Sequence, residues 1–247
     1  CFFVDIICLN VVDYIEFLLG FVMAFTQTRR RHVSRSGIAE HTVLRNTYFL
    51  LGLTLLFSAL CTILSVVFHF THTNILIHIV CLYGLLFLVN SFAHSALGVL
   101  FTFLFTGYMG LSLGPMVSMV LHGYANGPAI VLNTTACTGL IFLGLSAYTL
   151  VSGKNYSFMG GTLFMLLFGG IVLSLMGIFF QTPLLILMTN ALFILVFSGL
   201  IMYHTSEIIH GGETNYILAT ISLYLALYNL FVHLLHFFAM MQNNDRN

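Results

Sequence analysis

Long apolar runs separated by short polar breaks make up the chain from residue 47 onward. Each run is close to or above the roughly 20 residues that a membrane-spanning helix needs. The breaks, "THTN", "HGYANGP", "SGKNYS" and "QTP", are rich in turn formers, and connections this short make consecutive helices antiparallel neighbours. We therefore predict an all-α membrane protein whose seven transmembrane helices lie near 47–70, 75–94, 96–121, 128–152, 158–180, 184–205 and 216–241.

Composition supports the same class. Hydrophobic residues make up 60% of the chain and the mean hydropathy is +1.05, which is more apolar side chain than one soluble core can hide. Seven basic and seven acidic residues leave no net charge, and the sequence has no glycine-rich phosphate loop. Nucleic acid is therefore excluded as a partner, and membrane lipid is the expected surrounding.

The basic residues predict how the chain is oriented in the membrane. Lys and Arg in short loops stay in the cytoplasm, and six of the seven cations fall on one side of the predicted helices. These six are Arg29, Arg30, Arg31, Arg35, Arg45 and Lys154. We therefore predict that the basic segment 25–46 and the breaks 152–157 and 206–215 are cytoplasmic. The polar tail 242–247, which carries Arg246, is predicted to lie outside.

Residues 1–24 form a separate apolar segment with Asp5, Asp13 and Glu16. Its fourteen Leu, Ile, Val and Phe residues favour insertion by about 7 kcal/mol, while each acidic residue near a helix centre costs about 3 kcal/mol. The free energy of inserting this segment into the membrane is thus close to zero, and both an inserted and a surface position stay open. We expect this segment to be an extension apart from the working fold of residues 47–241.

Glycines recur at spacings that bring small residues onto one side of a helix. In lipid such residues allow helix backbones to approach closely, so we interpret them as packing positions. An alternative is a functional hinge at Gly114–Pro115, where proline removes a backbone donor. The predicted packing residues are Gly107, Gly110, Gly114, Gly160, Gly161, Gly169 and Gly170.

The sequence indicates neither a metal site nor a catalytic site, and no cofactor. Its five cysteines form no CxxC pair, and the histidine pairs His69/His72 and His233/His236 lack a nearby third ligand in sequence. We interpret these histidines as interfacial. Acidic residues within residues 25–241 are too few for the convergent acid, base or nucleophile that an enzyme needs, so we predict no enzymatic activity.

Four titratable residues gather at the end of the sixth run: His204, Glu207, His210 and Glu213. Ionisable groups at membrane depth are costly and mark a candidate site, here for ion binding or proton sensing. The simpler interpretation is a solvated turn, in which His210-Gly211-Gly212 ends one helix and Glu213 begins the next. The spacing favours the turn.

Four stretches resemble the gamma-proteobacterial branch of the Bax-inhibitor (TMBIM) membrane family. They are "HTVLRNTYFLLGLTLLFSA", "TGYMGLSLGP", "SFMGG" and "TSEIIHGGETNYILATISLYLALYNLFVHLL", and the resemblance covers residues 41–240 in order. It implies a bacterial inner-membrane protein with six helices around a central last helix. It also implies association with, and modulation of, the membrane-anchored AAA protease FtsH.

The wider family also includes pH-sensitive calcium leak proteins, so the alternative function is a pH-sensitive calcium or proton leak channel of the Bax-inhibitor type. The resemblance implies that such a leak is gated by two aspartates on the last two helices. At the matching positions this chain has His204 and Ala226. Neither offers the carboxylate oxygens that calcium prefers, so the family's calcium site is not predicted to be retained.

Overall fold

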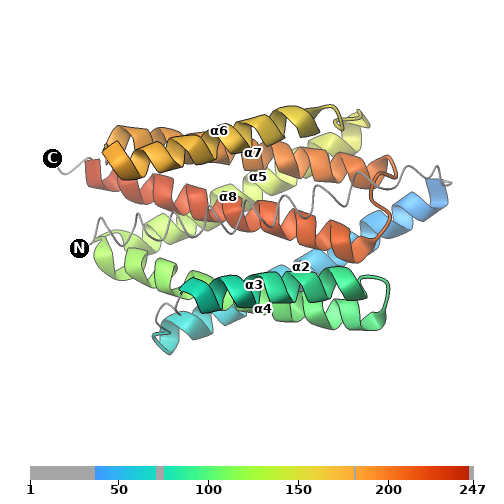
Figure 1. Ribbon diagram of the computed structural model, residues 1–247, viewed down its shortest axis with the longest axis horizontal. Coiled ribbons are helices and arrows are strands. Elements are labelled where there is room, and N and C mark those ends of the chain that lie inside the picture. Colours follow the sequence, from blue (N-terminus) through green and yellow to red (C-terminus); the bar gives the residue numbers. More distant parts are fainter. Residues whose placement is uncertain (1–36, 71–74, 181, 245–247) are drawn as a thin grey trace. The chain divides into compact units, whose positions relative to one another are not determined.

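The computed structural model describes residues 37–70, 75–180 and 182–244, and all regular structure in these ranges is helical. Seven helices form in this part of the chain, in the order in which the apolar runs occur in the sequence. Figure 1 shows how they follow one another along the chain. The predicted all-α class and the predicted number of helices are confirmed. The helices are α2 (Gly37–Val67), α3 (Ile75–Phe92), α4 (Ala96–Gly123), α5 (Gly127–Ser152), α6 (Met159–Phe180), α7 (Pro183–Ile209) and α8 (Tyr216–Asn244).

Two helix ends differ from the predicted runs by four residues or more. The first helix begins at Gly37 rather than at residue 47, and α7 continues to Ile209 rather than ending at residue 205. An apolar run marks only the part of a helix that suits lipid, and a helix continues into polar sequence where no breaker stops it. Residues 38–46 contain neither glycine nor proline, so the helix includes the end of the basic segment.

Six of the described helices are long and apolar enough to cross a membrane, and α3 contributes the shorter apolar stretch Ile77–Phe92. The last helix is the most enclosed of them. In the most apolar part of α8, 72% of the residues are buried, compared with 22–44% in the other five long spans. A high buried share suits a helix that faces protein on most sides, and its central position among six helices stays a prediction.

The described chain divides into two compact units. One comprises residues 129–206 and 226–244, here the α5–α7 unit, and the other comprises residues 37–128 and 207–225, here the α2–α4 unit. The last helix contributes its first half to the α2–α4 unit and its second half to the α5–α7 unit. The predicted segment 1–24 and most of the basic segment lie outside the described residues.

Within the α2–α4 unit, α4 packs against both α2 and α3, and Figure 1 shows α3 and α4 side by side. Three glycines of α4 lie at the contact with α2. A Cβ atom added at Gly107 would meet the ring of Phe57, and one added at Gly110 would meet the backbone oxygen of Ser58. The third, Gly114, lies against the side chain of Ser65, so close approach of these two helices requires residues without a side chain.

Within the α5–α7 unit, α6 and α7 pack together, as Figure 1 shows for the two ribbons. Gly170 of α6 lies against the ring of Phe193, and Gly199 of α7 lies against Leu163. Gly160 is buried, whereas a Cβ atom added at Gly161 or Gly169 would meet open space. The glycines singled out in the sequence therefore occupy two different environments.

Candidate functional site

The turn between α7 and α8 ends the first helix with a left-handed glycine. Gly211 has a φ of +71°, and the amide of Gly212 donates to the carbonyl of Glu207 at 2.8 Å. A hydrogen bond from the second residue past the cap to the third-last helical carbonyl is the Schellman arrangement. The amide of Glu213 also donates to the Glu207 carbonyl, at 3.2 Å. The sequence "HGGE" at residues 210–213 thus forms the C-terminal cap of α7.

Replacing Gly211 by alanine is expected to destabilise the protein by about 1–2 kcal/mol, because a Cβ atom is strained at this positive φ. For a chain of this length, the melting temperature in detergent should fall by about 2–4 °C per kcal/mol. Gly211→Asn should lose less, since asparagine tolerates the left-handed region. The matched control is Gly52→Ala in α2, where an added Cβ meets open space. A Gly211→Ala protein as stable as this control would contradict the expectation.

The four titratable residues of this region occupy different places. The carboxylate of Glu207 lies against Gly212, and the Glu207 side chain is only 9% exposed. Glu213 accepts a hydrogen bond from the amide of Asn215 at 2.8 Å through Oε1, and His210 is exposed. These three belong to the α2–α4 unit, whereas His204 belongs to the α5–α7 unit and makes an edge contact with the ring of Tyr203. Their role in ion binding or proton sensing stays a prediction.

Asn215, which the sequence analysis did not single out, fixes the start of α8. Its Oδ1 accepts from the amide of Ile217 at 2.9 Å, as expected of an N-cap residue. Its Nδ2 donates to the carbonyl of Ala93 at 2.8 Å and lies 3.3 Å from Nδ1 of His94. One side chain therefore caps α8 and joins it to the connection between α3 and α4.

The connection between α5 and α6 is held to the end of α7 within the α5–α7 unit. The amide of Tyr156 donates to Oγ of Ser206 at 2.8 Å. Hydrogen bonds from Ser152 and Tyr148, together with the nearby charge of Lys154, lower the pKa of Tyr156. This connection also carries Lys154. The hydrogen bond to Ser206 therefore holds a positive charge at the end of the unit.

A buried hydroxyl cluster lies at the centre of the α2–α4 unit. The Tyr224 hydroxyl is 2.7 Å from Oγ of Ser58 and donates to the carbonyl of Thr106 at 3.2 Å. The Tyr224 ring makes an edge contact with Phe105, and Tyr224 is 1% exposed. Its hydroxyl therefore links α8 with both α2 and α4. No local sequence pattern predicts this long-range contact.

A second polar cluster joins α7 and α8 in the α5–α7 unit. Nδ1 of His233 is 2.9 Å from Oδ1 of Asn190, and Nδ2 of Asn190 donates to the carbonyl of Ile186 at 2.9 Å. Because this second bond fixes the amide, Oδ1 faces the imidazole and Nδ1 of His233 carries the proton. The imidazole also stacks on the rings of Phe193 and Phe197, at centroid distances of 4.7 and 5.4 Å.

The interpretation of His233 as interfacial is wrong, because the residue is 3% exposed and hydrogen-bonded inside the helix pair. One turn further along α8, Nδ1 of His236 is buried without a hydrogen-bond partner among the described residues. In that part of the chain, no group of three His, Cys, Asp or Glu side chains is placed to hold a metal ion. The cluster is therefore a polar contact between two helices.

Comparison with known proteins places this helical, largely apolar chain in a family. A family model described as "Inhibitor of apoptosis-promoting Bax1" matches residues 40–244. The chain belongs to this Bax-inhibitor family. Modulator of FtsH protease YccA from Escherichia coli K12 is 46% identical over 209 residues, which cover 83% of this chain and 92% of YccA. The family resemblance found in the sequence is confirmed.

Other relatives show how far the similarity extends. An uncharacterised membrane protein of Vibrio cholerae is 42% identical over 219 residues, covering 88% of this chain and 97% of that protein. Bax inhibitor 1 of Schizosaccharomyces pombe is 32% identical over 176 residues, covering 70% of this chain and 63% of that protein. YccA of Escherichia coli O6:H1 is named an inner membrane protein. Bax-inhibitor relatives are thus named as membrane proteins, modulators or inhibitors rather than enzymes.

Proposed function

We propose that this Bax-inhibitor protein associates with the FtsH protease in the bacterial inner membrane and modulates how FtsH handles membrane substrates. The observation that supports this most is the 46% identity to YccA, a modulator of FtsH protease, over 92% of the YccA length. In this proposal the chain acts as a binding partner and performs no catalytic step of its own.

The length of α2 suggests how a cytoplasmic segment would reach the protease. This helix has 31 residues, so it is about 46 Å long, whereas the hydrocarbon core of a bilayer is about 30 Å thick. Part of the helix therefore extends beyond the lipid. Its start carries the exposed residues His41 and Arg45 and forms the end of the basic segment 25–46. The cations in that segment support a cytoplasmic position, where the catalytic part of a membrane-anchored protease can meet it.

Electrostatic attraction is the physical basis that we propose for the first encounter. Charges at the rim of an interface raise association rates, and their effect falls as salt concentration rises. A basic, partly helical segment therefore provides a salt-dependent contact, while lateral packing of small residues in lipid provides contacts that salt does not screen. The C-terminal end is then on the periplasmic side.

Replacing Arg29, Arg30, Arg31 and Arg35 together by glutamine is expected to weaken association with FtsH, most clearly at low salt, because four cations are lost. The measurement is co-purification from detergent, followed by the rate at which FtsH degrades a model membrane substrate with and without the protein. The glutamine variant should shift that rate toward the rate of FtsH alone.

The fourfold replacement of the same residues by lysine is the matched control, because it keeps the charge and should keep the effect. Since cations also set orientation, thiol labelling from each side of the membrane must show that both variants insert as the wild type does. Loss of association in both variants would assign the effect to guanidinium geometry rather than charge. If wild-type protein neither binds active FtsH nor changes its rate, the proposed function is wrong.

A further inference from the structure

A proline interrupts the hydrogen bonding of α4 within the α2–α4 unit. The helix runs from Ala96 to Gly123 and contains Pro115. Proline has no amide hydrogen, so the carbonyl four residues earlier, that of Leu111, loses its usual helical donor. A carbonyl left without a donor in lipid is costly, and a neighbouring helix can supply the replacement.

The replacement donor comes from α2. Oγ of Ser65 donates to the carbonyl of Leu111 at 2.8 Å, and Ser65 is 1% exposed. Next to the proline, Gly114 leaves room for this contact, because a Cβ atom there would collide with the Ser65 side chain. One turn earlier, Thr62 donates to the carbonyl of Gly110 at 2.9 Å. Two hydroxyls of α2 are thus bonded to the backbone of α4 directly before the proline.

We propose that Ser65 is a clasp that couples the direction of α4 beyond Pro115 to the position of α2. The segment 116–123 beyond the proline is held in one orientation only while the Ser65 hydroxyl reaches the Leu111 carbonyl. A shift of α2 along its axis by one helical turn, about 5.4 Å, takes the hydroxyl out of reach, and the segment beyond the proline then changes its angle.

The coupling spans most of the membrane. From Gly37 to Ser65, α2 is an unbroken helix, and 28 residue steps of this helix correspond to about 42 Å. A displacement imposed at the start of α2 is therefore passed to the clasp near its other end. This inference rests on the contacts between α2 and α4 and holds whether or not FtsH is the partner.

The alternative is that Ser65 only stabilises the contact between two helices. The two roles differ in one respect. If Ser65 replaces the donor that proline lacks, then Pro115→Ala, which restores an amide to bond with Leu111, makes the hydroxyl dispensable. If Ser65 acts only as an interhelical contact, its removal has the same effect whether residue 115 is proline or alanine. The combination of Ser65→Ala and Pro115→Ala therefore separates the roles.

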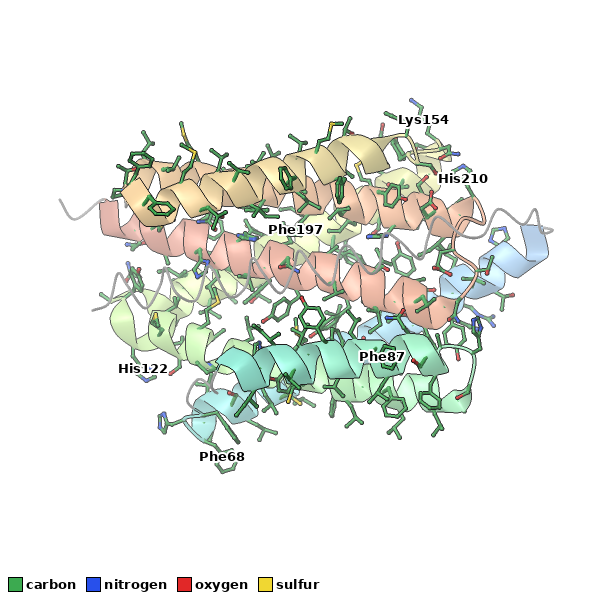
Figure 2. All side chains as sticks on the ribbon, viewed as in Figure 1. Phe68, Phe87, His122, Lys154, Phe197 and His210 are labelled. Carbon is green, nitrogen blue, oxygen red and sulfur yellow. The ribbon has the colours of Figure 1, made fainter. Side chains whose placement is uncertain are left out.

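The test measures the distance between the outer ends of the two helices by pulsed electron resonance in the full-length protein. Nitroxide labels are attached at Phe68→Cys and His122→Cys in a background without native cysteines, and both positions are exposed and labelled in Figure 2. A 20° change of bend moves the end of the segment 116–123 by about 4 Å. Ser65→Ala should shift or broaden the distance distribution by this amount, and Gly114→Ala should do the same.

Three controls make the result decisive. In the Pro115→Ala background, Ser65→Ala should leave the distribution unchanged. Thr102→Val removes a hydroxyl that bonds within α4, to the carbonyl of Gly98 at 2.8 Å, and should have no effect. A second label pair at Phe49→Cys and Leu97→Cys, before the proline, should report the same distance in every variant. An unchanged Phe68 to His122 distribution in Ser65→Ala, or an equal change with alanine at position 115, overturns the proposal.

Discussion

Replacement of His233 by alanine is expected to destabilise the protein by about 3 kcal/mol, one of the two largest effects that we expect from a single substitution. Two losses add up. The variant leaves Oδ1 of Asn190 buried without its donor, and it removes a ring that stacks on Phe193 and Phe197. Both losses fall inside the contact between α7 and α8, where the surrounding side chains have little room to relax.

The measurement is the melting temperature in detergent, which should fall by about 6–12 °C for a chain of this length. His210→Ala is the matched control, because His210 is exposed and its replacement should change the melting temperature by little. A double variant, His233→Phe with Asn190→Leu, replaces both polar partners by apolar groups and should recover most of the loss. Equal melting temperatures for His233→Ala and His210→Ala would show that the cluster contributes nothing to stability.

The elements of the fold could be predicted from the sequence because lipid imposes a simple rule on helix length. In the described part of the chain, each of the seven predicted runs forms a helix, and Thr182-Pro183 and Gly211 lie at the helix ends where proline and glycine are expected. What the runs could not show was where α2 begins. Hydropathy reports the solvent that a residue prefers, and residues 38–46 include the polar Glu40, His41 and Arg45 yet contain neither glycine nor proline.

The polar contacts inside the units could not be predicted, because they join residues far apart in sequence. Asn190 and His233 are 43 positions apart, and Ser58 and Tyr224 are 166 apart. One signal was present, since Asn190 is a lone amide in the apolar run "LLILMTNALFILVF", and a polar residue at membrane depth needs a partner. Nothing local identified that partner as His233 rather than another polar side chain.

The spacing of glycines along the sequence likewise cannot predict which of them contact another helix. Gly110 and Gly139 both lie in apolar helices with another glycine nearby in sequence, yet only Gly110 touches a neighbouring backbone. Spacing says which residues share a helix face, whereas the packing of the other helix decides whether that face is used. The difference matters for substitution, because the same change is expected to have opposite outcomes at the two kinds of position.

Gly110→Val is expected to lower the free energy of unfolding by about 3 kcal/mol, because the larger side chain overpacks the contact between α2 and α4. A Cβ atom at this position meets the backbone oxygen of Ser58, and a backbone atom cannot turn aside as a flexible side chain can. The helices α2 and α4 must then separate, which breaks the 2.9 Å bond from Thr62 to the Gly110 carbonyl and strains the neighbouring bond from Ser65. One side chain thus opens a contact held by several small residues and hydroxyls.

Two measurements test whether Gly110→Val separates α2 from α4. The melting temperature in detergent should fall by about 6–12 °C, and the thiol of Cys61, half-buried on α2 beside Thr62, should react faster with a maleimide. Gly52→Val is the matched control, because it introduces the same side chain on the exposed side of α2, where an added Cβ meets open space. Gly110→Val and Gly52→Val could instead have the same melting temperature and the same labelling rate at Cys61. Close backbone approach would then not hold α2 to α4, and the hydroxyl bonds alone would account for the contact.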